Sequence, residues 1–246
     1  MRSSNLWQGV VGYWSATAGP SGYRLLDRSG RGNHGTLINM TADDWVGDGG
    51  RYALDFDGSN DYITAGNQAA YFQSTEPFYF ACWVKIDSFV SNGGIFARAN
   101  GNAQGYHMRT LSTSRIRWIV YNQNGGNFYG VDTSVLSTGV WYSLVSSFFN
   151  GVSRLWLNGI EQTTTIISGT VGSIDQDFPF EIGRFISAHG SFQLAELVAA
   201  GAIASPVLAS QFHQIGRGGM LTSRRRRRAY FAGSGLRRRL LLTGQI

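Results

Sequence analysis

Apolar and polar residues alternate with a period of two along much of the chain, which is the pattern of β-strands. In residues 51–57 (RYALDFD), Leu54 and Phe56 fall on one side and small or acidic residues on the other, which predicts a half-buried strand. The pair Asp57-Gly58 predicts a turn, because glycine adopts the positive φ that tight reversals require. Residues 62–64 (YIT) then predict a returning strand.

A longer apolar run and two turn signals extend this pattern. Residues 78–86 (FYFACWVKI) are apolar on both faces, as in the central strand of a sandwich. Within residues 141–167, the pairs Asn150-Gly151 and Asn158-Gly159 separate alternating segments. Asn-Gly is the preferred pair of a two-residue type I′ hairpin turn, so this segment predicts three consecutive antiparallel strands.

One helix is predicted near the C-terminal end of the strand-rich region. Ser205 and Pro206 have the residue types preferred at the N-cap and the first position of a helix. Apolar residues follow at helical spacing from Leu208, and Gly216 predicts the end of the helix. We therefore expect a short helix over residues 206–214.

The whole pattern predicts an all-β fold, a two-sheet antiparallel sandwich of about a dozen short strands closed by one helix. With 246 residues, of which 43% are apolar and 15% charged, the chain can bury a large core. Its 33 glycines and 4 prolines fit strands joined by tight turns better than they fit disorder.

Charge divides the chain into two parts. Residues 217–246 hold 9 of the 21 basic residues and no acidic one, so residues 1–216 carry 12 basic residues against 15 acidic ones, a net charge of −3. We therefore divide the chain into a β-sandwich domain, residues 1–216, and an extended arginine-rich C-terminal arm, residues 217–246.

The arm combines arginines with apolar residues. Lys85 is the only lysine of the chain, so the arm carries its charge on guanidinium groups, which pair bidentately with carboxylates and phosphates. The interleaved apolar residues favour docking onto a protein surface over a disordered tail or a nucleic-acid tether. The predicted partner-anchoring residues are Arg224, Arg225, Arg226, Arg227, Arg228, Arg237, Arg238, Arg239, Leu240, Leu241 and Leu242.

Two further features concern the compartment of the protein. The N-terminal sequence MRSSNLWQGVVGYW lacks the apolar core of a signal peptide, and no apolar run approaches the ~20 residues of a membrane span. We therefore expect a protein that is made in a cytoplasm and has no membrane anchor. Cys82 is the only cysteine, which excludes an internal disulfide, and its apolar surroundings predict a buried thiol.

Several spaced segments resemble a known family. They are, in order, YWSA, LLDRSGRGNHGTL, YALDFDGSNDYI, FACWVKID, GVWYSLVSSFFNGVSRLWLNG, FEIG and FQLAELV. Together they resemble the laminin G-like, concanavalin A-like jelly rolls over roughly residues 7–216. The resemblance implies a jelly-roll domain that binds sugars or proteins, often with calcium near one rim. The Asp-Glu pair that is usual on the family's closing strand is Ala195-Glu196 here, so one acidic side chain is missing.

Four oxygen-bearing side chains in predicted loops are candidate metal ligands: Asp27, Asp57, Asn60 and Asp61. Two interpretations stand. The side chains supply the hard oxygen ligands that Ca²⁺ prefers, or they hydrogen-bond their own turns, as Asp and Asn commonly do. Calcium is the only cofactor that the sequence suggests.

Trp118 and Trp156 are candidate carbohydrate-binding residues. An exposed indole face is a good platform for a sugar ring, whereas a tryptophan on a strand of a sandwich more often packs in the core. We expect at least one of the two to be a core residue.

The sequence predicts no catalytic site. Residues 30–35 match G-x-G-x-x-G, but no helical pattern follows, as a dinucleotide site requires. Glycosidases of the concanavalin A-like superfold use two carboxyl groups that flank the bond to be cleaved, and Glu161, Glu181 and Glu196 are isolated along the chain. We therefore expect a protein without enzymatic activity.

Two functions fit these features. The first is a structural protein of a virion, such as a phage capsid-decoration, head-fibre or tail-associated protein. Its lectin-like jelly roll would lie at the virion surface, and its arm would bind neighbouring copies or other virion proteins rather than nucleic acid. The second is a bacterial, calcium-dependent glycan-binding module. Surface glycans are candidate ligands in both.

Overall fold

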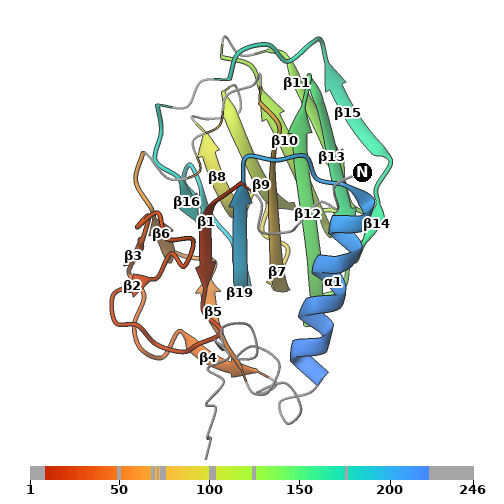
Figure 1. Cartoon of the computed structure of the whole chain (residues 1–246). Coiled ribbons are helices and arrows are strands. Elements are labelled where there is room, and N and C mark those ends of the chain that lie inside the picture. The colour runs from red at the N-terminus through yellow and green to blue at the C-terminus, as the bar shows by residue number, and fades with distance from the viewer. Residues whose placement is uncertain are drawn as a thin grey trace, which may run out of the picture.

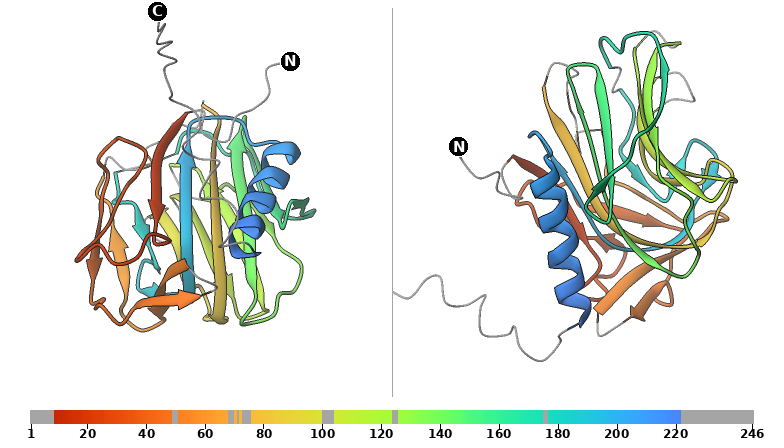
Figure 2. Two further views of the ribbon diagram at one scale, coloured as in Figure 1. Left: turned by 60° about the horizontal axis from the view of Figure 1, so that its bottom comes forward. Right: turned by 90° about the vertical axis from the view of Figure 1, so that its right-hand side faces the viewer.

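The computed structural model describes residues 9–48, 51–67, 70, 72, 76–99, 104–123, 126–174 and 177–221. These residues form two antiparallel β-sheets that pack face to face, with one helix on the outer side of the first sheet (Figure 1). The two layers and the helix are seen edge-on in the right-hand view of Figure 2. This arrangement confirms the predicted all-β, two-sheet jelly-roll sandwich with one helix near its C-terminal end.

The first sheet, sheet A, has eight strands. In spatial order, seven of them are β14 (Ile160–Glu161), β13 (Val152–Leu157), β12 (Trp141–Phe149), β7 (Phe78–Ser88), β19 (Ser191–Ala200), β5 (Arg51–Asp57) and β4 (Trp45–Asp48). The eighth, β1 (Val10–Ser15), pairs with the C-terminal part of β19, beyond the part that pairs with β5.

The second sheet, sheet B, has eleven strands. Nine follow in the order β15 (Thr164–Ser168), β11 (Phe128–Asp132), β10 (Arg115–Tyr121), β9 (Gly105–Leu111), β8 (Gly94–Ala99), β16 (Glu181–Ile182), β6 (Tyr62–Thr64), β3 (Gly35–Ile38) and β2 (Arg24–Leu25). A small hairpin of β17 (Arg184–Phe185) and β18 (Ala188–His189) joins this sheet through β8.

Strand β7 lies in the middle of sheet A and is buried on both faces, as its sequence predicts. On one face, Phe78, Phe80 and Cys82 belong to the core between the two sheets. On the other face, Tyr79 and Trp83 belong to a second apolar cluster that packs beneath the helix. Burial raises the pKa of the Cys82 thiol, in agreement with its position in the core.

The two Asn-Gly pairs form the predicted hairpin turns. Asn150 and Gly151 have φ values of 51° and 78°, and Asn158 and Gly159 have values of 51° and 81°. Positive φ at both central residues is the signature of a type I′ turn. The turns connect β12 to β13 and β13 to β14, which confirms the antiparallel series.

The segment from residue 51 to residue 66 is the first correction to the sequence interpretation. Its two extended parts are β5 and β6, but β5 pairs with β4 and β19 in sheet A, whereas β6 pairs with β3 and β16 in sheet B. The turn at Gly58 therefore carries the chain from one sheet to the other and does not close a hairpin.

The helix is the second correction. Helix α1 (Pro206–Leu221) begins where predicted, and the Ser205 hydroxyl accepts a hydrogen bond of 3.2 Å from the Leu208 N–H. The helix continues past Gly216 because this glycine serves close packing rather than termination. A Cβ atom at position 216 would lie 1.9 Å from Cε2 of Trp83, so only glycine allows this approach.

Helix α1 therefore crosses the predicted boundary between residues 216 and 217. The predicted anchoring residues of the arm, Arg224 to Arg228 and Arg237 to Leu242, lie outside the described residues. In the described part of the chain, the only helix is too short in apolar length to cross a bilayer.

Candidate functional site

The outer face of sheet B carries charged and aromatic side chains on its central strands. Strands β9 and β10 pair so that Met108 lies opposite Trp118, and both point into the core. The alternate residues point outward: Arg109 lies opposite Arg117, and Arg117 lies opposite Asp132 of β11. We call the outward-facing set His107, Arg109, Arg117, Tyr121, Asp132 and Phe185 the sheet B face.

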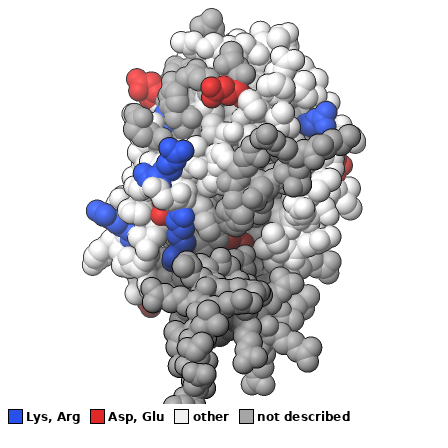
Figure 3. Space-filling view, viewed as in Figure 1, with Lys and Arg blue, Asp and Glu red and all other residues white. Residues whose placement is uncertain are grey.

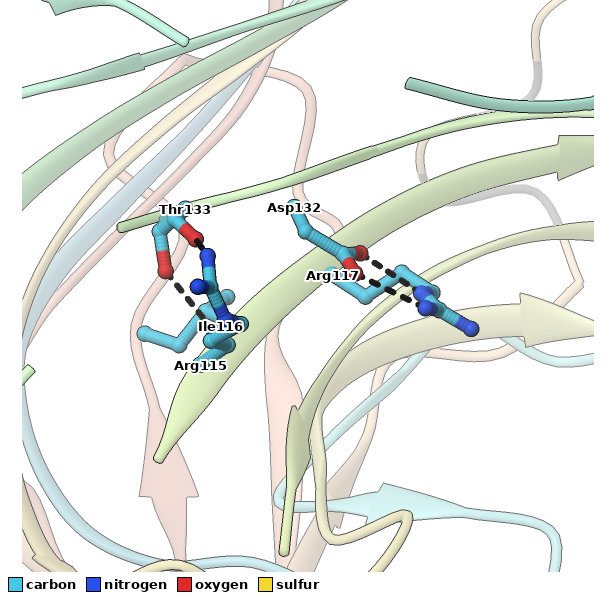
Figure 4. Close-up of polar contacts among 5 residues, drawn as sticks. All are labelled: Arg115, Ile116, Arg117, Asp132 and Thr133. Atoms are coloured by element: carbon cyan, nitrogen blue, oxygen red, sulfur yellow. Dashed lines mark hydrogen bonds and ion pairs between the residues drawn. The ribbon is translucent and has the colours of Figure 1, made fainter. Parts of the chain in front are cut away.

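A bidentate ion pair lies at the centre of the sheet B face. Arg117 Nε and an Nη atom donate hydrogen bonds of 2.6 and 2.8 Å to the two carboxylate oxygens of Asp132 (Figure 4). These hydrogen bonds raise the pKa of the Arg117 guanidinium. The paired planar groups are held in register by the β10–β11 ladder, so their orientation is fixed by the backbone.

A second contact ties the start of β10 to the end of β11. The Arg115 guanidinium donates a hydrogen bond of 2.5 Å to the Thr133 carbonyl oxygen, and the Thr133 hydroxyl accepts one of 3.0 Å from the Ile116 N–H (Figure 4). Two arginines of one strand thus fix the strand next to it. This contact supports the geometry of the Arg117–Asp132 pair one residue away.

His107 lies beside this row and is fully buried. Its ring stacks on Phe185 of β17 at a centroid distance of 3.9 Å and on Tyr121 at 5.7 Å. Neither ring nitrogen has a hydrogen-bond partner among the described residues. Burial, together with the positive charges of Arg109 and Arg117, lowers the pKa of His107 well below its usual value, so the imidazole is neutral.

Arginine–aromatic contacts extend the sheet B face toward β16 and β6. The Arg109 guanidinium carbon lies 5.2 Å from the centre of the Phe185 ring, and that of Arg184 lies 3.6 Å from the centre of the Tyr62 ring. Arg184 Nε also donates a hydrogen bond of 3.0 Å to Glu181. The face therefore combines fixed cations, fixed carboxylates and aromatic rings. The rings of His107, Tyr121 and Phe185 are buried, so the partly exposed guanidinium groups of Arg117 and Arg184 are the groups that can donate hydrogen bonds to a polar ligand.

Sequence reasoning did not find the sheet B face, although the signal was present. In GYHMRT and RIRWIVY, the polar residues alternate with the core residues. Strand parity alone would have placed His107, Arg109, Arg117 and Tyr121 on one side. Only the pairing of β9 with β10 brings the two sets together.

Trp118 and Trp156, the two candidate sugar-binding residues, are both fully buried. Trp118 packs between the sheets, and its indole N–H donates a hydrogen bond of 3.1 Å to the Ser147 carbonyl oxygen. Trp156 packs beneath α1 with Trp83 and Phe212. The expectation of a core tryptophan holds for both, and neither offers a free ring face to a sugar.

Asp27 is buried, and its carboxylate is hydrogen-bonded mainly by groups of its own loop. Its carboxylate accepts hydrogen bonds from the backbone N–H groups of Tyr13, Ser29 and Asn33 at 2.8–2.9 Å and from the Ser29 hydroxyl at 2.9 Å. Burial raises the pKa of Asp27, but these hydrogen bonds outweigh it and lower the pKa below its usual value. The carboxylate thus fastens the loop to β1.

The Asp57–Asp61 turn is likewise internally bonded. Asp57 Oδ1 accepts hydrogen bonds from the N–H groups of Ser59 (2.7 Å) and Asn60 (3.3 Å), and Asp61 Oδ2 accepts one from the Asp57 N–H (3.2 Å). These bonds match the second interpretation of the candidate metal ligands, in which Asp and Asn hold their own turns.

The four candidate metal ligands do not form one site. Asp27 follows the end of the β2–β3 ladder at Leu25, whereas Asp61 precedes the opposite end of the β3–β6 ladder at Tyr62. The four residues of β3 lie between these two ends, so the ends are about 10 Å apart at ~3.3 Å per residue. Within the described ranges, no group of three or more His, Cys, Asp and Glu side chains could hold a metal ion. Hydrogen bonds within their own turns account for the carboxylates of Asp27, Asp57 and Asp61, and calcium binding by these residues stays a prediction.

The three isolated glutamates stay apart in the fold. Glu161 lies in edge strand β14 beside Arg154, Glu181 pairs with Arg184 in sheet B, and Glu196 accepts a hydrogen bond of 2.8 Å from the Tyr13 hydroxyl on the outer side of sheet A. Two of the three therefore lie in sheet A, on β14 and β19 with three strands between them, and the third lies in sheet B.

Comparison with solved structures supports the fold. The binding domain of Paraclostridial Mosquitocidal Protein 1 is similar, with a TM-score of 0.69 and 13% identity over 86% of this chain and 53% of that one. The binding domain of Botulinum neurotoxin serotype G has a TM-score of 0.65 and 16% identity over 84% and 51%. Trypanosoma rangeli sialidase has a TM-score of 0.61 and 13% identity over 86% and 33%.

The chain thus spans about half the length of the two toxin binding domains and a third of the sialidase. No curated protein matches it by sequence. A family model described as the concanavalin A-like lectin/glucanases superfamily matches residues 57–195, more than half of the chain. With its two-sheet jelly roll and this match, the chain belongs to the concanavalin A-like lectin/glucanases superfamily.

Proposed function

We propose that the chain is a non-enzymatic structural protein of a virion, in which the lectin-like jelly roll is displayed and the arginine-rich arm anchors it. The arm would bind neighbouring copies of the chain or other virion proteins.

The observation that carries this proposal is the way in which the arm is joined to the domain. Helix α1 leads directly into residues 222–246 and packs on sheet A through Leu208 and Phe212, which are both nearly fully buried. An arm that anchors the domain must be joined firmly to the folded core, and α1 provides that connection. The sequence beyond it is cationic, whereas the domain is mildly acidic.

This proposal predicts that deletion of residues 222–246 abolishes assembly and leaves the domain folded. The deletion should start at residue 222, because α1 extends to Leu221. We expect the full-length chain to be found in purified particles or to form oligomers by size-exclusion chromatography with light scattering. The truncated chain should be monomeric and melt at the same temperature.

A matched variant separates charge from guanidinium geometry. Replacing the eight arginines at 224–228 and 237–239 by lysine keeps the charge but removes bidentate pairing, and it should weaken assembly. The anchor proposal fails if the truncated chain still assembles, or if the full-length chain stays monomeric and binds duplex DNA with a steep dependence on salt.

A second candidate function is a glycan-binding module of a bacterium, and the sheet B face favours it. The Arg117–Asp132 pair provides fixed, charged hydrogen-bonding groups for a sugar, and the Arg117 side chain is 22% exposed. Two similar structures are binding domains of toxins and one is a sialidase, which is consistent with this role. We propose it without calcium, since the carboxylates of Asp27, Asp57 and Asp61 are bonded within their own turns.

The glycan-binding function predicts loss of binding when the ion pair is broken. Arg117→Met removes the guanidinium and should weaken binding to an immobilised glycan panel at least about tenfold, because it leaves the Asp132 carboxylate unpaired as well. Tyr23→Ala, at an exposed position far from the face, is the control. Unchanged glycan binding by Arg117→Met would remove the sheet B face from consideration.

A further inference from the structure

The hairpin of β17 and β18 lies across the outer side of sheet B. It joins the ladder of that sheet at one position, where His189 of β18 lies opposite Gly94 of β8. Its backbone passes so close to β8 that a Cβ atom at position 94 would lie 2.2 Å from the Arg184 carbonyl carbon. We call residues 184–189 the sheet B lid.

Two glycines form the base of the sheet B lid. The Gly190 N–H donates a hydrogen bond of 2.9 Å to the Gly183 carbonyl oxygen, and the Gly183 N–H donates one of 2.9 Å to the Ile95 carbonyl oxygen of β8. Gly183 has a φ of 88°, a conformation that glycine adopts without cost. The base is thus fixed to sheet B through the backbone, and its two glycines can serve as a hinge for the residues between them.

The tip of the sheet B lid is strained. Ile186 has a φ of 59°, which is rare for a β-branched residue, and its side chain is 48% exposed. Such a conformation persists only where neighbouring contacts hold it. The adjacent Phe185 supplies them: it is 2% exposed, and its ring centre lies 3.9 Å from that of His107 and 5.2 Å from the Arg109 guanidinium carbon. The closed lid therefore depends on the contacts of Phe185.

His107 lies directly beneath Phe185. It is fully buried, and neither of its ring nitrogens has a hydrogen-bond partner in the described part of the chain. Buried polar groups are nearly always bonded, so hydrogen bonding does not explain a histidine at this position. An apolar side chain would fill the space without leaving polar atoms unsatisfied. What a histidine adds is the ability to bind a proton near neutral pH.

The groups around His107 oppose its protonation while the lid is closed. Both carboxylates on this face are already paired with arginines, one at the β10–β11 ladder and one beside the lid. Burial, and then the positive charges of Arg109 and Arg117, keep the pKa of His107 low. The titratable or charged groups that face His107 from the neighbouring strands and the lid are Arg109, Arg117, Tyr121, Asp132, Glu181, Arg184 and His189.

From this geometry we propose that the sheet B lid is acid-sensitive: it is closed while His107 is neutral and opens at Gly183 and Gly190 when His107 binds a proton. Opening removes Phe185 from the imidazole, so water can solvate the charge and the strain at Ile186 is released. The inference is independent of the virion and glycan-binding roles, because it concerns a movement within the domain itself.

The direction of the pH dependence follows from the pKa of His107 in the two states. With the lid open, the ring is solvated and its pKa returns toward the ordinary value of about 6.5, whereas with the lid closed its pKa is lower. The closed state is therefore most stable above the open-state pKa and loses stability as the pH falls below it. In that window the ratio of open to closed chains rises by up to about tenfold per pH unit.

Opening would also change the charge that sheet B presents. His107, Arg109 and Arg117 would be uncovered together, which would create a compact cationic surface beside the ring of Phe185. On the side of the molecule shown in Figure 3, the visible described residues are mostly neither acidic nor basic. The density of charge around His107 is thus a local feature of sheet B.

The test is hydrogen exchange of the full-length chain between about pH 7 and about pH 5, with each rate corrected for the intrinsic effect of pH. We expect protection of residues 184–189 to fall at least about tenfold over this range and to recover on return to neutral pH. Protection of the central strand β7 should not change, because the lid opens without unfolding of the core.

Matched variants assign the response to one side chain. His107→Phe keeps a ring beneath Phe185 but binds no proton, so its lid should stay protected within about twofold at every pH. His107→Leu should behave in the same way and replaces it if the first variant does not fold. His189→Gln removes the histidine of the lid itself, and Glu181→Gln removes the carboxylate beside it, and both should keep the acid response.

Four results would overturn the inference. The first is equal protection of the wild-type lid at neutral and acid pH, whatever the variants do. The second is an acid response that persists in both His107 variants. The third is its loss in His189→Gln or Glu181→Gln, which would assign the proton to another group. The fourth is a parallel loss of protection in β7, which would show that acid unfolds the whole domain.

Discussion

Replacing Trp118 by alanine should lower the free energy of unfolding by about 3–5 kcal/mol, the usual cost of removing a large aromatic core residue. The indole is fully buried between the sheets. Its ring centre lies 5.8 Å from that of Phe80 and 6.0 Å from those of Phe96 and Tyr106. The substitution would open a cavity among these rings and remove the hydrogen bond to the Ser147 carbonyl oxygen. Urea unfolding with comparison of midpoint and slope measures the loss.

Two further variants provide comparisons for the expected loss of unfolding free energy. Trp118→Phe keeps most of the ring volume but loses the indole N–H, so we expect a smaller loss of about 1–2 kcal/mol. Tyr23→Ala, at a position that is 83% exposed, should change stability by less than about 0.5 kcal/mol. If Trp118→Ala lost less than about 1 kcal/mol but abolished sugar binding, the core assignment would be wrong and the original expectation of a sugar platform would return.

Local sequence signals predicted the local structure of this fold. A continuous apolar run marks β7, because a strand covered on both faces must be apolar on both. The two Asn-Gly pairs fix type I′ turns, because asparagine and glycine tolerate positive φ at both central positions. Ser205 and Pro206 mark the start of α1 for equally local reasons.

Features that depend on distant partners could not be predicted in this way. Apolar and polar residues alternate in the same way along residues 51–57 whether the strand that follows pairs with them in one sheet or belongs to the other sheet. Strand β5 pairs with β19, more than 130 residues later in the chain, and that pairing decides the outcome. Gly216 looks like a helix terminator until Trp83 of β7 is placed against it.

The candidate site residues likewise divide into features that the local sequence indicates and features that depend on distant partners. The two tryptophans were ambiguous because a strand has two faces, and sequence does not say which one the solvent reaches. His107 and Arg117 gave no motif, since they acquire neighbours only when β9 pairs with β10. The loop carboxylates were recognisable as turn residues, but their separation depends on which ends of the β3 ladders they occupy.

Asp27→Asn should destabilise the domain by about 2–3 kcal/mol at pH 7, because the substitution affects both acceptor oxygens of a buried carboxylate. Oδ1 accepts from the Tyr13 and Ser29 N–H groups, and Oδ2 accepts from the Ser29 hydroxyl and the Asn33 N–H. An amide NH₂ in either place would face donors instead of acceptors. Asp57→Asn, in an exposed turn, is the matched control and should cost less than about 1 kcal/mol.

The pH dependence of the Asp27→Asn effect gives the prediction its sharpest form. The pKa of Asp27 is lower in the folded protein than its usual value, so its stabilisation is fully present above the unfolded pKa of about 3.9 and is lost as the pH falls through the folded pKa. Wild-type and variant chains should therefore converge in stability in strong acid and differ most near neutrality. Millimolar Ca²⁺ should leave the melting temperature of the wild-type chain unchanged, since the Asp27 oxygens are already bonded to the loop. A rise in melting temperature that Asp27→Asn removes would show that the carboxylate binds metal, since a ligand that binds only the folded state must stabilise it.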